Sequence, residues 1–170
     1  MSARIVTGLL RSIDLVQIAG MATRFTCRRA TIADADALAA VLSSSFRLLT
    51  FLPMLHTVAE DRRFIEDVVL KECKVTVAES EGRIASFLAR NGEDVRLLYT
   101  HPEFIGAGAG GLLLEDAKAS APALELWCFQ ANRAARRFYE RHGFRAIRFT
   151  DGQDNEEKMP DVRYRWSRSG

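Results

Sequence analysis

Hydrophobic residues recur along the chain with two spacings. In some segments their period is about two residues, and in others they have the wider spacing of amphipathic helices. Runs rich in β-branched and aromatic residues, bounded by polar turns, predict strands. These runs are Phe25–Ala30, Lys74–Ser80, Ile84–Arg90, Val95–Thr100, Leu124–Phe129, Phe144–Thr150 and Val162–Trp166. Short turns at Glu81–Arg83 and Asn91–Gly92 join three of them into a meander.

Helical spacing appears four times between these strands. We expect a helix after an N-cap at Thr31 or Asp34, one over Val58–Leu70, one from a glycine run to about Ser120, and one over Arg133–Arg141. Pro122 would end the third helix, and Gly143 the fourth. A meander followed by alternating strands and helices predicts an α/β fold with a mixed sheet flanked by helices.

Length and charge narrow the class of protein. The 170 residues fit one domain that buries its own core without disulfides or metal. A net charge of +2 gives no drive toward nucleic acid or membranes. Cys27, Cys73 and Cys128 are far apart and match no zinc spacing, which is typical of reduced thiols in a cytoplasmic protein. We expect residues 1–22 to lie outside the fold and residues 23–168 to form the domain.

The run Gly106–Gly111 follows a predicted strand and precedes a predicted helix. Alternate glycines let backbone N–H groups point inward, and a helix N-terminus adds the positive end of its dipole, so the run predicts an anion site, most plausibly for phosphate. The letters match G-x-G-x-x-G, but about a hundred residues precede them, whereas a dinucleotide fold places this loop after its first strand. Gly110–Leu112 also lacks the Lys-Ser/Thr pair of a nucleotide-hydrolysing loop.

A second block begins where the next strand ends. Asn132 has the chemistry to bind an amide-bearing ligand, and Tyr139 follows seven residues later, two turns along the same helix face. Taken singly, Asn132 is typical of an N-cap and Tyr139 of a core residue. Together with a glycine run one β-α unit upstream, they indicate a common site.

With these two blocks in this order, the chain resembles the GCN5-related N-acetyltransferase (GNAT) family over about Arg24–Trp166. Val95–Gly111 is similar to the family's acyl-CoA motif, and Asn132–Phe144 is similar to the motif that follows it. The resemblance implies a mixed sheet of six or seven strands, splayed between the fourth and fifth. It also implies acetyl transfer from acetyl-CoA, as co-substrate, to a primary amine.

The resemblance implies roles for single residues. Pantetheine amides would lie against the backbone of Leu98, Tyr99 and Thr100. The pyrophosphate would bind the N–H groups of Gly106, Ala107, Gly108, Ala109, Gly110 and Gly111. Asn132 would face the pantetheine arm, and Arg137, with Arg133 and Arg136, would add charge near the nucleotide unless these arginines form a solvated helix face. The family's usual Gln or Arg is Ile105 here and its second basic residue is Ala107, so the backbone would do most of the phosphate binding.

The chemistry needs a neutral amine and a protonated leaving thiol. The resemblance directs Tyr139 toward the thioester sulfur as general acid. Asp94 matches an acidic base position in part of the family; Glu79, His56 or a water chain are the alternatives, and Trp127 stands where other members carry a glutamate. Cys128 as nucleophile is not favoured, because no histidine is placed to activate it.

The resemblance implies that the acceptor side lies near the segment Asp151–Asp161, because this segment joins the last two strands, which border the acceptor mouth in this family. Its five acids against one lysine would attract a cationic amine, or would form an ordinary solvated loop. Phe51, Leu52, Met54, Leu55 and His56 would add an apolar wall. The expected partner is a small-molecule or peptide amine, with no nucleic acid and no membrane, and a homodimer is left open.

Two other functions remain as alternatives. A non-catalytic acyl-CoA-binding regulatory module is favoured by Ile105 and Ala107 and opposed by Asn132 and Tyr139. A nucleic-acid-binding domain would use the arginines between Arg136 and Arg148, but Glu140 interrupts that cluster and no recognised motif accompanies it.

Overall fold

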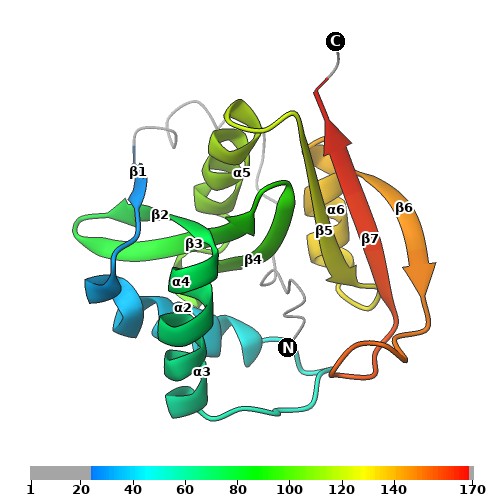
Figure 1. Cartoon of the computed structure of the whole chain (residues 1–170), viewed down its shortest axis with the longest axis horizontal. Helices are drawn as coiled ribbons and strands as arrows, with labels where there is room; N and C mark the ends of the chain where they lie inside the picture. Colours follow the sequence, from blue (N-terminus) through cyan, green and yellow to red (C-terminus); the bar gives the residue numbers. More distant parts are fainter. Residues whose placement is uncertain (1–23, 169–170) are drawn as a thin grey trace.

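Seven strands form one sheet in the order β1-β2-β3-β4-β5-β7-β6 (Figure 1). The computed structural model describes residues 24–168, and the predicted extension over residues 1–22 lies outside them. The strands are β1 (Thr26–Arg29), β2 (Lys74–Ser80), β3 (Arg83–Asn91), β4 (Asp94–Thr100), β5 (Ala123–Phe129), β6 (Arg145–Thr150) and β7 (Asp161–Ser167). Only β4 and β5 pair in parallel, so the predicted mixed sheet is confirmed.

The helices begin and end close to the positions that the sequence predicts. The longer ones are α2 (Ala35–Phe46), α3 (Val58–Phe64), α5 (Ala109–Ala119) and α6 (Arg133–Arg141). The short ones are η2 (Ile32–Asp34), the π-helical η3 (Ile65–Val69), α4 (Leu70–Glu72) and η4 (Pro102–Phe104). A capping box between Thr31 and Asp34 starts η2, which runs directly into α2.

The helix predicted over Val58–Leu70 differs in one respect, because η3 interrupts it with a wider turn. Ile65 and Val69 lie four residues apart and are both buried, at 0% and 2% exposure. Residues four apart share one face of an ordinary α-helix as well, so the burial of this pair does not depend on the wider turn. The hydrophobic period therefore predicts the buried face here but not the π turn.

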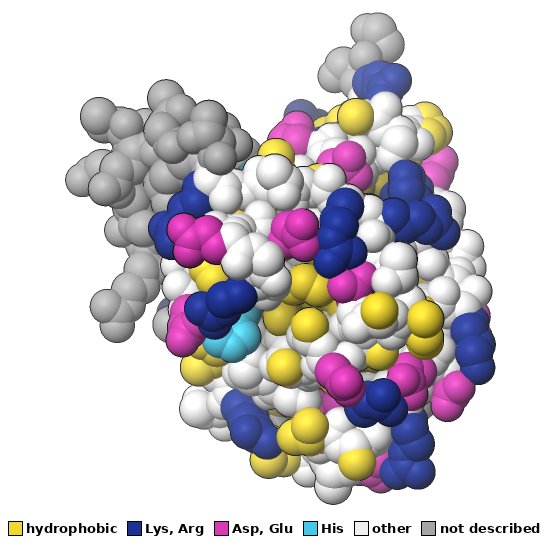
Figure 2. Space-filling view, turned by 90° about the vertical axis from the view of Figure 1, so that its left-hand side faces the viewer, with side chains coloured by type: hydrophobic (Ala, Val, Ile, Leu, Met, Phe, Trp, Pro, Cys, Tyr) yellow, Lys and Arg dark blue, Asp and Glu magenta, His cyan; other side chains and the backbone are white. Residues whose placement is uncertain are grey.

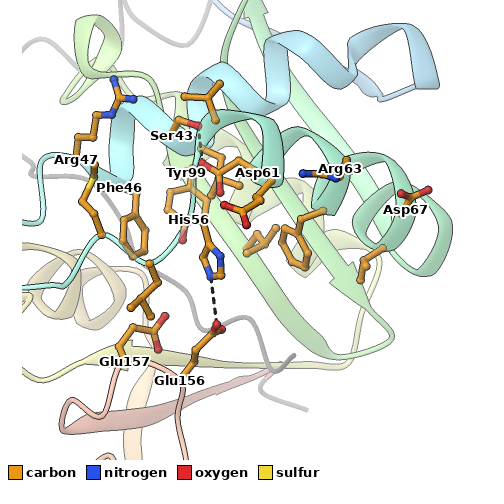
Figure 3. A pocket seen from close by; sticks show the side chains of 18 residues that line it. Ser43, Phe46, Arg47, His56, Asp61, Arg63, Asp67, Tyr99, Glu156 and Glu157 are labelled. Carbon is orange, nitrogen blue, oxygen red and sulfur yellow. Dashed lines mark hydrogen bonds and ion pairs between the residues drawn. The ribbon is translucent and has the colours of Figure 1, made fainter.

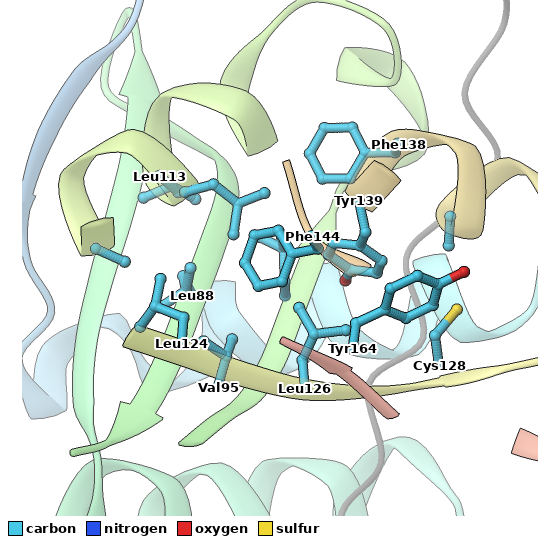
Figure 4. Close-up of a cluster of buried hydrophobic side chains, with 14 of the residues drawn as sticks. Leu88, Val95, Leu113, Leu124, Leu126, Cys128, Phe138, Tyr139, Phe144 and Tyr164 are labelled. Atoms are coloured by element: carbon cyan, nitrogen blue, oxygen red, sulfur yellow. The ribbon is translucent and has the colours of Figure 1, made fainter. Parts of the chain in front are cut away.

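Hydrophobic cores lie on both faces of the sheet. Against α5 and α6 the buried side chains include Leu88, Leu113, Leu126, Tyr139 and Tyr164 (Figure 4). Against α2 and η3 they include Leu38, Ile65, Val77, Phe87 and Leu97. Each fully buried large side chain contributes about 1.5–3 kcal/mol relative to exposure. Neighbouring residues of β4 serve different cores, Leu98 the first, and Leu97 and Tyr99 the second.

The β2–β3 turn is tight and depends on glycine. Ser80 pairs with Arg83, and the two residues between them, Glu81 and Gly82, have φ of 52° and 74°. Two positive φ values are the signature of the hairpin turn whose twist matches the flanking strands. Open space surrounds Gly82, where an added Cβ would meet nothing within 4 Å.

Charged side chains of both signs are interspersed over the face shown in Figure 2. That face therefore carries no continuous basic stripe of the kind that binds nucleic acid. Within residues 24–168, no helix is long and apolar enough to cross a membrane.

Candidate active site

The strands β4 and β5 pair at one point only, and the sheet has a crevice where they diverge. Asp94 pairs with Glu125 at the start of the two strands, where Glu125 N–H also donates to Glu93 O at 2.9 Å. No further register pair joins them, whereas β3–β4 and β5–β7 stay paired along their length. Beyond that pair the two strands diverge, and a ligand that pairs as an added strand would lie along the β5-facing edge of β4. This matches the splay that the resemblance implies.

The predicted pantetheine-binding stretch of β4 is held in place by two buried serines. Ser45 Oγ, from α2, donates to Thr100 O at 2.6 Å. Ser86 Oγ, from β3, donates to Tyr99 O at 2.7 Å and lies 2.9 Å from Thr100 Oγ1. Both serines are 0% exposed. Sequence analysis did not identify them, because a serine within an apolar strand or helix carries no local sign of its partner.

The glycine run begins after η4 and leads into α5. Gly106 and Gly108 have φ of 78° and 95°, and Gly108 is the N-cap residue without a side-chain cap. The first N–H groups of a helix have no partner within the helix, so Ala109, Gly110 and Gly111 present theirs at its end. An added Cβ at Gly108 would meet nothing within 4 Å. This is the geometry of a backbone anion cradle.

Two of these glycines also allow close helix packing. A Cβ on Gly111 would lie 3.0 Å from Nε2 of His142, which closes the C-terminal end of α6. A Cβ on Gly110 would contact Phe138 and Thr100 at 3.5 Å. The glycine run thus serves the packing of α5 on α6 as well as the proposed cradle, and the motif alone does not separate these roles.

Residues of α6 lie where the second motif expects them. Asn132 is 2% exposed and caps α6, its Oδ1 accepting from Ala135 N–H at 3.1 Å. Tyr139 is 0% exposed, with ring centroids 5.8 Å from Phe144 and 6.0 Å from Tyr164 (Figure 4). Their burial fits the core and capping interpretations, and the ligand roles stay predictions.

The arginines of α6 have different surroundings. Arg136 Nε donates to the Tyr164 hydroxyl at 3.2 Å, and that hydroxyl donates to Glu140 Oε1 at 2.7 Å. Desolvation is the first cause that raises the pKa of Tyr164, to about 12. Arg137 is exposed. Arg136 is thus engaged inside the fold, whereas Arg137 stays accessible to a ligand.

The candidate bases and nucleophile lie in different parts of the molecule. Asp94 begins β4 at the point where β4 meets β5; desolvation raises the pKa of its carboxyl group, and Arg163 and Arg96 oppose that rise. Glu79, on β2, pairs with Arg28 Nε at 2.9 Å on the strand next to it, away from β5. Cys128 is 0% exposed, and burial raises its thiol pKa to about 12, which suits a core residue.

A cavity of about 370 Å³ opens on the α2 face of the sheet (Figure 3). Leu97 and Tyr99 of β4 form part of its wall, so it borders the strand that edges the crevice. Its other lining residues come from α2, from the segment before α3, from α3 and η3, and from the β6–β7 loop. Met54, Leu55 and His56 of the predicted apolar wall line it together with Glu156 and Glu157 of the acidic loop. Phe51 and Leu52 pack into the core instead.

Two polar pairs line this cavity. Ser43 Oγ donates to Asp61 Oδ2 at 2.5 Å, and His56 Nε2 lies 3.2 Å from Glu156 Oε1 (Figure 3). Ser43 and Asp61 were not recognised from the sequence, since they lie on two helices and only tertiary packing brings them together. Asp94 and Glu79 do not line the cavity.

The acidic β6–β7 loop is built around a buried asparagine. Asn155 is 1% exposed; its Nδ2 donates to Met159 O and Asp161 Oδ2, and its Oδ1 accepts from Met159 N–H. Gly152 accepts a hydrogen bond from Asn155 N–H at 3.1 Å. These contacts fix the loop that carries Glu156 to the cavity, so the loop is more than a solvated hairpin end.

Within the described residues 24–168, no three His, Cys, Asp or Glu side chains gather as a metal site.

Comparison with known proteins provides independent evidence of the chain's family. A profile described as "Acetyltransferase (GNAT) domain" matches residues 71–146. This range includes both the glycine run and the Asn132–Tyr139 segment.

Individual relatives agree with that profile. The peptidyl-lysine N-acetyltransferase YjaB of Escherichia coli (strain K12) is 30% identical over 106 residues, which are 60% of this chain and 72% of that protein. The solution structure of apo YjaB from Escherichia coli has a TM-score of 0.66 at 26% identity, covering 84% of this chain and 97% of that one. A GCN5-related N-acetyltransferase structure from Rhodopseudomonas palustris has a TM-score of 0.68 at 22% identity, covering 84% and 95%.

Proposed function

The chain belongs to the GNAT family of acetyltransferases, and we propose that it transfers acetyl from acetyl-CoA to a primary amine by direct attack within a ternary complex. The observation that carries this proposal is that one strand, β4, borders both the proposed donor site and the cavity proposed for the acceptor. β4 diverges from β5 beyond the Asp94–Glu125 pair, and its Leu97 and Tyr99 line the cavity on the α2 face. Donor and acceptor would thus meet at one strand, and holding two reactants in contact is the main source of rate in such a reaction.

The donor half of the site would rest mainly on backbone groups. Leu98, Tyr99 and Thr100 would pair with the pantetheine amides. The N–H groups of Gly106 and of Gly108 to Gly111 would hold the pyrophosphate, whereas the predicted role of Ala107 N–H is disfavoured because it donates to Phe104 O at 3.1 Å. Asn132 and Arg137 would complete the site from α6. Bound there, acetyl-CoA supplies a reactive thioester. Because Ile105 and Ala107 carry no charge, we expect only modest affinity for CoA.

Restoring charge to this loop tests that assignment. We expect Ile105→Arg and Ala107→Arg each to lower the Kd for CoA about two- to tenfold, since a partly exposed guanidinium–phosphate contact is worth about 0.5–1.5 kcal/mol. Calorimetric titration with CoA measures the change. The matched control is Ala119→Arg, which adds the same charge at the other end of α5. Equal gains in all three variants would mean that only net charge acts and that the loop is not the phosphate site.

Proton transfer needs an acid and a base on opposite sides of the thioester. Tyr139 is the proposed acid for the leaving thiolate. Asp94 remains a candidate base, and His56 is a second one, favoured because it lines the acceptor cavity and is held by Glu156. If His56→Gln keeps the wild-type pH–rate profile while Asp94→Asn changes it, the base is Asp94.

The acceptor would be a primary amine of a small molecule or a peptide. The relative YjaB is named a peptidyl-lysine N-acetyltransferase, which supports an amine rather than a hydroxyl acceptor. Glu156 and Glu157, delivered by the ordered β6–β7 loop, support a cationic acceptor.

Release of CoA thiol from acetyl-CoA, with and without a panel of primary amines, tests the proposed activity. We expect release that depends on an amine and acetylated product in equal amount. Tight CoA binding without release for any amine would instead favour the regulatory module, the second candidate, whose support is the loss of basic residues at Ile105 and Ala107.

A further inference from the structure

The cavity beside β4 points to one kind of acceptor. Resting on the proposed function, we propose that the acceptor is a small primary amine with an apolar body and no carboxylate, such as an arylalkyl amine, with its ammonium group held at Asp61. The ammonium first loses one proton to the base, and its neutral nitrogen then forms a bond to the acetyl carbon while the carbon–sulfur bond breaks. The nitrogen loses a second proton as the amide forms, and the thiolate takes a proton from the acid. Of the two protons that the nitrogen loses, one in net replaces the proton of the acid and the other goes to water.

The walls of the cavity favour an apolar body. Half of its eighteen lining side chains are aliphatic or aromatic, among them Phe46, Met54, Leu55, Val58 and Phe64. Met54, Leu55 and Val58 are 68%, 42% and 50% exposed. Three exposed apolar side chains around one cavity mark a surface that a ligand covers. A volume of about 370 Å³ also lies in the range of small-molecule sites.

The charges of the cavity favour a cation. Its lining carries five carboxylates, Glu60, Asp61, Asp67, Glu156 and Glu157, against two guanidinium groups. Arg63 interacts electrostatically with Glu60 and Asp67, so part of its charge is already balanced. In Figure 3 the guanidinium of Arg47 points away from His56 and Glu156. A carboxylate on the acceptor would therefore meet mostly like charge, which disfavours amino acids relative to the matching amines.

Asp61 is the carboxylate best placed to hold the ammonium group. It accepts from Ser43 Oγ at 2.5 Å and lines the same cavity as Tyr99 of β4. Ser43 is 7% exposed and Asp61 is half-buried, so their hydrogen bond is partly shielded from water. A charge-assisted hydrogen bond is strongest in such a setting.

Contacts across the cavity favour a small molecule over a peptide. His56, just before α3, reaches Glu156 of the β6–β7 loop at 3.2 Å and so joins the two segments that border the cavity. An extended chain lying between these segments would have to break that pair. A compact amine does not need to, because it enters the cavity end first.

Four acceptors tested side by side separate the alternatives: 2-phenylethylamine, phenylalanine, ethylamine and a blocked tripeptide with one central lysine. We expect kcat/KM for 2-phenylethylamine to exceed the other values at least about tenfold, a difference of about 1.4 kcal/mol. Phenylalanine adds only a carboxylate, and ethylamine lacks the ring. Preference for phenylalanine, ethylamine or the lysine peptide overturns this inference while leaving the proposed function intact. If none of the four acceptors causes release of CoA from acetyl-CoA, the proposed function is overturned, and the inference with it.

Two variants test whether the preference for 2-phenylethylamine arises from the side chains of the cavity. Asp61→Asn keeps the acceptor for Ser43 but removes the charge, and we expect kcat/KM for 2-phenylethylamine to fall about tenfold with KM for acetyl-CoA unchanged. The control Asp36→Asn removes an exposed carboxylate on α2 that pairs with Arg62 outside the cavity, and it should leave both values unchanged. Met54→Gln should raise KM for 2-phenylethylamine severalfold. Unchanged kinetics in Asp61→Asn would contradict the proposed ammonium site.

Discussion

Replacing Tyr139 by phenylalanine is expected to lower kcat by about a hundredfold while KM for acetyl-CoA changes less than about threefold. A positioned general acid contributes about 10²–10⁴ in rate, whereas the ring that packs against Phe144 and Tyr164 is kept. An interaction used only in the transition state lowers kcat without raising KM. Steady-state kinetics with a purified amine acceptor measure both constants.

A second buried tyrosine provides the control for this experiment. Tyr164 lies in the same core, 6.0 Å from the ring of Tyr139, and its hydroxyl donates to Glu140. Tyr164→Phe removes a buried hydroxyl of the same kind, and we expect kcat to stay within about threefold of the wild type, well short of the loss expected of a general acid. If both variants lose activity equally, the effect of Tyr139 is structural and its role as acid is wrong.

The second large effect is expected at Gly152, the glycine that begins the acidic β6–β7 loop. Its φ is +85°, and an added Cβ would lie 2.2 Å from the backbone C and O of Met159. Backbone atoms cannot yield as a flexible side chain can. We expect Gly152→Ala to lower the free energy of unfolding by about 2–5 kcal/mol, through the left-handed conformation and the clash together. The melting temperature should fall on the order of 10 °C.

Gly82→Ala is the matched control for Gly152→Ala. Gly82 has a similar φ of +74°, but its added Cβ would meet nothing within 4 Å. Only the conformational cost remains, so we expect a loss of about 1–2 kcal/mol. Urea unfolding of both variants gives the two values. Equal losses would mean that the loop around Met159 rearranges easily, contrary to the fixed position that the structure gives Glu156.

Local patterns in the sequence predicted most of the fold. Strand and helix bounds follow from hydrophobic period and from local signals such as the Thr31–Asp34 capping box and Gly143 after α6, which act over a few residues. Two motifs in order indicated the family, because the backbone cradle of a strand–glycine–helix unit is itself local. The π turn at η3 escaped this reasoning, because the hydrophobic period that places Ile65 and Val69 on a buried face is the same for an ordinary α-helix.

The cavity could not be predicted in the same way. His56 and Glu156 are a hundred residues apart, and Ser43 and Asp61 come from different helices. Through the family resemblance, sequence analysis placed an apolar wall and an acidic loop together on the acceptor side. The structure shows which of their residues line one space, namely Met54, Leu55 and His56 of the wall and Glu156 and Glu157 of the loop.

By itself, the sequence determined the strands and helices, their order along the chain and the glycine run that indicates an acyl-CoA site, because each of these depends on residues close together in the chain. That order in turn indicated a mixed sheet. Only the tertiary structure showed which residues pair where β4 meets β5, that Ser45 and Ser86 hold the carbonyl groups of β4, and that Asp61 and Tyr99 line one cavity. These features depend on where distant segments pack, and side chains that are unremarkable along the chain acquire their chemistry from that packing.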